Sequence, residues 1–351
     1  MIEKLGNIAT YLNGYAFKPS DWSESGLPII RIQDLTGTSA KPNYYEKPYD
    51  KKYEINEGDV LISWSASLGV YVWHGRKALL NQHIFKVIFD KIAVDKDFFV
   101  YQVEYILEKA TALVHGATMQ HLTRPVFNNL PFKLFPIERQ QKIALTLNTI
   151  STLINDRQKQ LQYLDGLIKS QFIELFGDVG KYELKSLAEV TEVIAGGDKP
   201  KDISENLTEE YCYPVYANGV DNEGLQCYSK EYRVEKEAVT ISARGTIGAT
   251  FIRQPFFTPI VRLIAVVPNR EVNVTYLKYA IDALGTSSTG SSQQQLTVPN
   301  IKKEMIAVPP LEKQKEFEQF IWQSDKSRLA VQKSLDELEI LKKSLMQKYF
   351  G

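Results

Sequence analysis

The sequence predicts an α+β protein built from two similar β-rich mixed domains that are joined by two long antiparallel helices. Two observations lead to this fold class. Segments of the first half reappear in the second half in the same order, and each repeat ends in a stretch of about 35 residues with helical periodicity. A duplication of this length indicates two copies of one folding unit, each large enough to have its own hydrophobic core.

The repeat is clearest around two proline-led motifs. Pro136–Ile143 reads PIERQQKI, and Pro310–Phe317, 174 residues later, reads PLEKQKEF. Other matched pairs, at the same or a slightly longer offset, are Leu122-Thr123 with Leu296-Thr297, Phe176-Gly177 with Phe350-Gly351, and Val60–Ser63 with Val239–Ser242. We therefore divide the chain into a first domain (1–135), a first helix (136–177), a second domain (178–309) and a second helix (310–351).

The sequence pattern of the two domains predicts many short strands. Short apolar runs are separated by turn signals such as Asn13-Gly14, Gly196-Gly197-Asp198 and Asn218-Gly219. The apolar run Val261–Val267 suits a buried strand. Apolar residues spaced three to four apart predict local helices over Asp97–Ala112 and Asn273–Ala283.

The two long helices carry a seam of apolar residues at alternating spacings of three and four, which is typical of a coiled coil. In the first helix the seam is Ile143, Leu147, Ile150, Ile154, Leu161, Leu164, Ile168 and Leu175, and in the second it is Phe317, Ile321, Val331, Leu335, Leu338, Leu345 and Tyr349. Such a stripe often packs on its own domain. A helix of about 35 residues is roughly 50 Å long, however, which exceeds one domain of this size, so we expect the helices to pair.

Connectivity gives the direction of the pairing. The first helix leads from domain one to domain two, and the second begins at domain two, so pairing along their length must be antiparallel. Two similar domains joined in this way are related by an approximate two-fold axis. Aligning the helix midpoints places Arg157 beside Asp336 and Arg328 beside Asp165.

Bulk composition narrows the class of protein. The 351 residues carry zero formal net charge, which argues against a free-standing basic DNA-binding protein but not against a subunit whose partners supply charge. No apolar run is long enough for a membrane span, and the N-terminus lacks the pattern of a secretory signal. Cys212 and Cys227 form no C-x-x-C pair, so we expect a reduced, cytoplasmic protein.

The sequence predicts no catalysis and no cofactor or metal. Neither G-x-x-x-x-G-K-[ST] nor G-x-G-x-x-G occurs, and no methyltransferase signature or nuclease-like acidic triad is present. All four histidines lie in the first copy, which does not suit a mechanism that both copies share. No Cys or His cluster has the spacing of a metal site.

Polar loops that match between the copies are the candidate recognition elements. Residues 115–122 and 289–296 are small, polar and glutamine-bearing, and glutamine can form two hydrogen bonds with an adenine edge in the major groove. The same loops could instead be capped turns at a shared domain–helix junction. Lysine and arginine mostly position phosphates, whereas asparagine, glutamine and arginine can read bases. The candidates in the first copy are Asn13, Tyr15, Lys18, Arg31, Gln33, Trp64, Ser65, Ser67, Thr118 and Gln120, and those in the second are Lys199, Lys201, Asn218, Arg244, Thr246, Gln293 and Gln294.

The order of these motifs resembles that of type I restriction-modification specificity (S) subunits over essentially the whole chain. The resemblance rests on Gly14–Phe17, on Ile30–Leu35 with its counterpart Pro214–Gly219, on Gly58–Ser63, on the loops before Leu122 and Leu296, on P-[IL]-E-[RK]-Q at each helix start and on Phe-Gly at each helix end. Each motif alone is weak, but their order, given twice, is specific.

The resemblance implies two target-recognition domains, each binding one half of an asymmetric bipartite DNA site. The helices would set the length of the unread spacer and dock methylation (M) subunits, two of them, with restriction (R) subunits joining through the complex. Catalysis would belong to those partners. The main alternative is a duplicated coiled-coil adaptor that binds a protein partner and reads no DNA. A second alternative is an enzyme with an unrecognised site, which would need a convergent acid/base cluster in a pocket.

Overall fold

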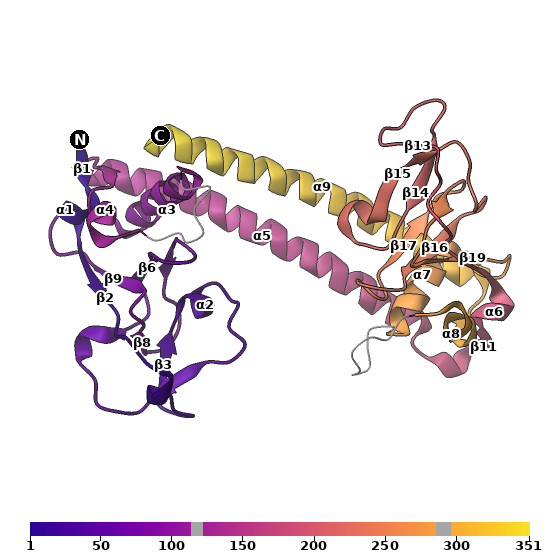
Figure 1. Cartoon of the computed structure of the whole chain (residues 1–351), viewed down its shortest axis with the longest axis horizontal. Helices are drawn as coiled ribbons and strands as arrows, with labels where there is room; N and C mark the ends of the chain where they lie inside the picture. The colour runs from indigo at the N-terminus through magenta and orange to yellow at the C-terminus, as the bar shows by residue number, and fades with distance from the viewer. Residues whose placement is uncertain (114–121, 286–295) are drawn as a thin grey trace. The chain divides into compact units, whose positions relative to one another are not determined.

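The computed structural model describes residues 1–113, 122–285 and 296–351. The chain forms two compact units. Unit 1 comprises Met1–Gln158 with Lys333–Gly351, and unit 2 comprises Lys159–Gln332. Two helices of 40 residues, α5 (Ile137–Phe176) and α9 (Leu311–Phe350), are each divided between the two units (Figure 1).

Unit 1 contains two four-stranded sheets and a small strand pair. The first sheet has the order β2-β9-β6-β7 and is antiparallel, and the second has the order β4-β3-β8-β5, in which β3 and β8 run parallel. The strands are β1 (Ile2–Lys4), β2 (Thr10–Asn13), β3 (Leu27–Ile30), β4 (Asn43–Tyr45), β5 (Glu54–Ile55), β6 (Val60–Ser63), β7 (Gly69–Val72), β8 (Ala78–Leu80), β9 (Ile84–Ile88) and β10 (Pro131–Lys133), which pairs with β1.

Short helices surround these sheets, and one longer helix covers the first of them. The helices are α1 (Leu5–Ile8), α2 (Ile32–Leu35), α3 (Lys96–Leu113) and α4 (Arg124–Asn128), with 3₁₀ turns η1 (Pro19–Asp21) and η2 (Lys51–Tyr53). The main core packs sheet residues such as Ile62 and Phe85 against Phe98 of α3 and Leu147 of α5. Met346 and Phe350, from the C-terminal end of α9, complete it.

Unit 2 repeats this plan. Its sheets have the orders β12-β19-β16-β17 and β13-β15-β14-β18, and β14 and β18 again run parallel. The strands are β11 (Glu183–Ser186), β12 (Thr191–Ala195), β13 (Ile203–Ser204), β14 (Tyr213–Tyr216), β15 (Leu225–Ser229), β16 (Ala238–Ser242), β17 (Thr250–Arg253), β18 (Thr258–Pro259), β19 (Leu263–Pro268) and β20 (Met305–Val308), which pairs with β11. The helices are α6 (Leu187–Val190), α7 (Val274–Ala283) and α8 (Val298–Lys303), with 3₁₀ turns η3 (Val179–Lys181) and η4 (Asp221–Gly224).

The repeated glutamine of the P-[IL]-E-[RK]-Q motif has the same structural task in both units. Gln140 is 1% exposed; its Nε2 donates to Phe135 O at 2.7 Å, and its Oε1 accepts from Asp95 N at 2.9 Å, just before α3. Gln314 is fully buried and bonds Pro309 O and Asn273 N, both at 2.7 Å. Each glutamine therefore ties the start of a long helix to the start of the domain helix, since a buried amide needs its partners.

The repeated Phe-Gly at each helix end completes a core. Phe350 packs against Phe98 with ring centroids 5.5 Å apart in unit 1, and Phe176 packs against Tyr276 at 4.8 Å in unit 2. The following glycines donate to the carbonyls of Gln347 and Ile173 and so close the last turn of each helix.

Within each unit the two long helices run in opposite directions. In unit 1 the early α5 residue Leu147 shares a core with the late α9 residue Met346, while Arg157 Nε donates to Ser334 Oγ at 3.2 Å. In unit 2, Phe176 near the end of α5 packs against Phe317 near the start of α9, with ring centroids 5.6 Å apart. Further along the same helices, the expected ion pair between Arg328 and Asp165 is present. Ser334 lies less than one helical turn before Asp336, the residue expected opposite Arg157.

The structure confirms the two predicted domain helices but not two other local predictions. The helices expected over Asp97–Ala112 and Asn273–Ala283 are α3 and α7, with Asn273 as the N-cap of α7. Gly196-Gly197 is not a turn, because Gly197 forms a parallel bridge with Ile260. The run beginning at Val261 is not wholly a buried strand, since β19 begins at Leu263 and Val261 is 49% exposed. Among the described residues, no helix has both the length and the apolarity that a membrane span requires.

Candidate nucleic-acid interface

A tight turn that precedes β9 is the base of the candidate site in unit 1. Ile84 N donates to Asn81 O at 3.2 Å and closes the turn, and Asn81 N donates to Ile30 O at 3.1 Å. Gly14 passes directly over it, because a Cβ on Gly14 would lie 2.2 Å from the carbonyl oxygens of Leu80 and Asn81. Glycine is the residue that permits such a close backbone approach. The Gly14 motif therefore seats the turn that carries His83.

The loop that joins β6 to β7 lies against this turn. Trp64 N donates to His83 O at 3.4 Å, and Ser63 Oγ donates to Ser67 O. Ala66 at the loop tip has a φ of 61°, a left-handed conformation that residues other than glycine rarely adopt. Two exposed residues of the loop, Ala66 and Ser67, are thereby held beside the turn.

Four of the candidate residues come together around one polar pocket of about 430 Å³. Arg31 and Gln33 reach it from the start of α2, and Ser65 and Ser67 from the β6–β7 loop. The remaining lining residues include Thr36, Thr38, Asn81 and His83. The Nδ1 atom of His83 is buried and has no hydrogen-bond partner among the described residues. A pocket lined by these donors and acceptors suits a base edge or a sugar–phosphate group.

Arg31 is held in a defined orientation at the edge of this pocket. Its guanidinium lies 5.4 Å from the ring centroid of Trp22 and 3.7 Å from Asp34 Oδ2. With the Asn43 amide turned so that its oxygen faces the guanidinium, that oxygen accepts from Arg31 Nη2 at 3.0 Å. These contacts hold the Arg31 guanidinium in one orientation, so it is not freely mobile in solvent.

The other candidates of unit 1 do not line the pocket. Tyr15 bridges Asn81 through its backbone and is 43% exposed, and Lys18 precedes η1. Asn13 Oδ1 accepts from Arg124 Nη2 at 3.4 Å. The Trp64 ring stacks on Phe85 with centroids 5.8 Å apart, so much of this side chain serves the core.

Unit 2 builds the same frame with different side chains. Leu263 N donates to Ile260 O at 3.1 Å, Ile260 N donates to Tyr216 O at 2.9 Å, and Ala243 N donates to Arg262 O at 2.9 Å. Gly196 passes over the turn, because its Cβ would lie 2.1 Å from Ile260 O. Arg262 therefore occupies the place of His83. In the adjoining loop, Gly245 has a φ of 74° and corresponds to Ala66.

Three candidates of unit 2 gather at this frame. Asn218 Nδ2 donates to Arg244 O at 3.0 Å, and Arg244 and Thr246 are exposed on the β16–β17 loop. Lys201 instead lines a separate pocket of about 320 Å³ with Lys230 and Arg233, and Lys199 is exposed just before it.

A buried arginine supports the neighbouring loop of unit 2. Arg253 is 2% exposed; its Nε donates to Thr240 Oγ1 at 2.9 Å, and its guanidinium lies 3.8 Å from the ring centroid of Tyr216. Its Nη1 bonds Glu223 Oε2 at 3.2 Å, where Glu223 has a left-handed φ of 52°. Burial lowers the pKa of Arg253 from its ordinary value, against the opposing effect of Glu223.

The remaining glutamine-loop candidates, Thr118, Gln120, Gln293 and Gln294, lie outside the described residues. The residues that follow those loops are described: Leu122 N donates to Trp64 O at 3.1 Å, and Leu296 N donates to Ala243 O at 3.2 Å. Both bonds join the chain to the β6–β7 or β16–β17 loop. The sequence analysis did not identify Asn81, His83 and Arg262 as site residues. Aligning the residues that lead into β9 with those that lead into β19 could have found them.

Comparison with known proteins identifies the family. The family model described as type I restriction modification DNA specificity domain matches residues 1–163 and 179–339. The chain belongs to this family. A Mycoplasma pneumoniae protein assigned as type I specificity subunit S.MpnORF89P is 32% identical over 276 residues, covering 72% of this chain and 80% of the relative.

Solved structures agree on the fold of this specificity-family member. The type I restriction-modification S subunit of M. genitalium covers 100% of this chain and 96% of its own, with a TM-score of 0.58 and 17% identity. A chain from work on complex assembly and conformational transition of the type I R-M system gives a TM-score of 0.63 at 16% identity, covering 100% and 97%. The family match and the 32% identical relative confirm the resemblance inferred from the sequence.

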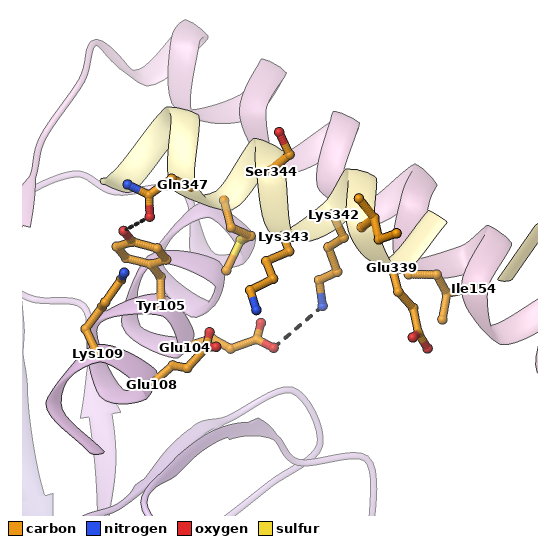
Figure 2. Close-up of a pocket in the computed structure, with 12 residues that line it drawn as sticks. Glu104, Tyr105, Glu108, Lys109, Ile154, Glu339, Lys342, Lys343, Ser344 and Gln347 are labelled. Atoms are coloured by element: carbon orange, nitrogen blue, oxygen red, sulfur yellow. Dashed lines mark hydrogen bonds and ion pairs between the residues drawn. The ribbon is translucent and has the colours of Figure 1, made fainter. Parts of the chain in front are cut away.

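A second surface of this specificity chain lies along the long helices. In unit 1 a groove of about 640 Å³ runs between α3 and the last turns of α9. Ile154, Ile340 and Met346 supply apolar surface, and charged side chains including Glu104, Glu108 and Lys343 flank it. Lys342 Nζ lies 3.5 Å from Glu104 Oε1, and the Tyr105 hydroxyl donates to Gln347 Oε1 at 2.7 Å. Figure 2 marks both interactions as dashed lines.

Unit 2 has a groove in the corresponding place. It measures about 710 Å³ and lies between α7 and the last turns of α5, with Ile168, Phe172 and Ile173 on its apolar side. Tyr279 lines it, and burial raises the pKa of Tyr279 to about 12. Ile173 and Ile340, which line the two grooves, are 66% and 69% exposed.

Proposed function

We propose that the two β-rich domains of this specificity chain, residues 1–135 and 178–309, are target-recognition domains that each read one half of an asymmetric bipartite DNA site. One observation carries the proposal. The same backbone frame, a turn seated under a glycine beside a hairpin loop, occurs in both units but presents different side chains. The matched pairs are Ser65 with Arg244, Ser67 with Thr246, and His83 with Arg262.

Different side chains on one frame suit different bases. Arginine donates two hydrogen bonds to guanine, whereas serine and threonine can bond several base edges. Arg244 and Arg262 in unit 2 stand where unit 1 has Ser65 and His83. The two half-sites therefore differ, and the target is asymmetric.

The long helices, residues 136–177 and 310–351, serve as the spacer in this proposal. Antiparallel pairing along a coiled-coil seam would relate the two units by an approximate two-fold axis and set the length of DNA that neither unit reads. The contact between Arg157 and Ser334 and the ion pair between Arg328 and Asp165 support that register.

The grooves beside α9 in unit 1 and α5 in unit 2 are our candidate docking sites for two methylation subunits. Two matched grooves suit two copies of one partner, and each has exposed apolar side chains that water disfavours. Restriction subunits would join through that complex. The chain itself would be non-catalytic and would act in the cytoplasm, where the DNA is. Because its net charge is zero, its partners would supply most of the contacts to DNA phosphates.

A test is methylome sequencing of cells that express this chain with its methylation subunit, compared with cells that express the methylation subunit alone. We expect methylation of a bipartite motif that depends on the chain. A competent methylation subunit that modifies nothing in its presence would overturn the proposal. A duplicated adaptor that reads no DNA is not favoured, because the family match is to a DNA specificity domain.

A further inference from the structure

Arg262 stands in a backbone position that disfavours it. It is the third residue of the turn Ile260–Leu263, which the bond from Leu263 N to Ile260 O closes at 3.1 Å, and its φ is 74°. A turn with positive φ at its third residue normally has glycine or asparagine there, because a Cβ crowds the backbone. Such a strained residue in an exposed turn is a reason to look for a function of its side chain.

The side chain of Arg262 is available to a ligand. Arg262 is exposed, and among the residues that the structure describes its guanidinium takes part in no hydrogen bond or ion pair. Arg253 of the same unit is buried against Thr240 and Tyr216, and Arg328 is paired with Asp165. Those two arginines have structural partners, whereas the Arg262 side chain has none within residues 1–113, 122–285 and 296–351.

The backbone of Arg262 is nonetheless fixed on several sides. Its carbonyl accepts from Ala243 N at 2.9 Å, next to Arg244. Gly196 N donates to Leu263 O at 2.8 Å, and Gly197 N donates to Pro259 O at 3.2 Å. The fixed backbone holds the start of the Arg262 side chain in one place, so binding has to order only the side chain itself.

The equivalent turn in unit 1 indicates what this position contacts. His83, its counterpart, lines the polar pocket together with Arg31, Gln33, Ser65 and Ser67. In unit 1 this turn position therefore lies beside the candidate DNA-reading residues. We expect Arg262, at the same position in unit 2, to face the DNA as well.

We propose that Arg262 determines specificity in unit 2 by donating its two-pronged hydrogen bonds to a guanine of the half-site that this unit reads. Arginine on the O6 and N7 atoms of guanine is the commonest specific contact in the major groove. This inference rests on the proposed function. It names Arg262 as the residue and guanine as the base, and neither follows from the family match.

Arg262→Gly separates recognition from folding. Glycine relieves the positive φ, so the variant should unfold at the same temperature as the parent or higher. In methylome sequencing with the methylation subunit, we expect one guanine position in one half of the motif to become degenerate. Discrimination at that position should fall about tenfold or more, and the other half should stay unchanged.

Arg262→Lys distinguishes base reading from phosphate binding. Lysine keeps the charge but loses the planar fork, so the same guanine position should again relax. If Arg262 contacts a phosphate instead, Arg262→Lys leaves the motif intact and Arg262→Gly weakens all sites uniformly with a smaller salt dependence. That outcome overturns the inference.

Arg270→Ala is the matched control. Arg270 is exposed just past the opposite end of β19, so its loss removes the same charge away from the turn. We expect an unchanged motif. A bipartite motif in the parent with both halves unchanged in Arg262→Gly would refute the role of Arg262 and leave the proposed function standing, whereas a parent with no bipartite motif would refute both.

Discussion

At the residue scale, two glycines explain how the chain crosses the turn before β9 in unit 1 and the turn before β19 in unit 2. Gly14 and Gly196 lie where a Cβ would meet carbonyl oxygens at 2.2 and 2.1 Å. Neither contact involves a flexible side chain that could move aside. The end of β2 or β12 therefore crosses the turn at His83 or Arg262 only if the crossing residue has no side chain.

Gly14→Ala should destabilise unit 1 by about 2 kcal/mol or more, because the clash is with backbone and the frame must shift. The matched control is Gly166→Ala in α5, where the new Cβ would meet no atom within 4 Å beyond the neighbouring helix backbone. That change should stabilise the chain by up to about 1 kcal/mol, as alanine is the better helix former. Urea denaturation of both variants measures the difference. Equal effects of the two substitutions would contradict the role given to Gly14.

At the scale of elements, the sequence predicted the helices well because their signals are local. The helix expected over Asp97–Ala112 is α3, Lys96–Leu113, and the one expected from Asn273 has Asn273 as its N-cap. In α5 the seam residues Ile143, Leu147 and Ile150 are buried, as their spacing indicates. Periodicity and caps act within one or two turns, so a sequence shows them directly.

The candidate site was only partly predictable, because its residues meet through non-local strand pairing. Asn81 and His83 reach Arg31 and the β6–β7 loop because β8 runs parallel to β3, and no local pattern encodes that register. Arg262 was hidden inside the apolar run Val261–Val267, whose first two residues form a turn rather than a strand. Trp64 was singled out by its place in a loop, but much of its ring packs on Phe85.

The pairing of the long helices gives a test at the same scale. Arg328 and Asp165 form an ion pair between α9 and α5 within unit 2, with side chains 35% and 54% exposed. A double-mutant cycle with Arg328→Ala and Asp165→Ala should give a coupling energy of about 0.3–1 kcal/mol, since solvent screens a pair of this exposure. Chemical denaturation of the four variants measures it.

The matched comparison is Lys333 with Glu337, a pair on α9 alone at 4.0 Å with side chains 78% and 69% exposed. Its coupling should be smaller than that of Arg328 with Asp165. The reverse order would argue that the two helices do not hold this register in solution.

At the scale of the whole molecule, the two copies share the same elements but carry different side chains at the candidate site. The cores use matched residues, such as Phe98 with Tyr276 and Phe350 with Phe176. The residues that differ include half-buried His83 and exposed Arg262, which hold matched positions in the turns before β9 and β19. If these residues read DNA as proposed, specificity can change in one copy without changing the fold of either.

Inserting four residues into each long helix adds roughly one turn, or about 6 Å. If the helices set the spacer, the methylated motif should gain about two unread base pairs, at 3.4 Å each, while both half-sites stay the same. Methylome sequencing reads both features at once. As a control, replacing four exposed helix residues by alanine without insertion should leave the spacer length unchanged. An altered half-site after insertion would contradict the separation of spacing from reading.

The division of reading between the two units is tested most directly by removing the polar side chains of one unit only. We would combine Gln33→Ala, Ser67→Ala and His83→Ala, all of which line the pocket of unit 1, and sequence the methylome with the methylation subunit present. One half of the motif should become degenerate, while the other half and the spacer length are retained. Relaxation of both halves, or of neither, would contradict the account.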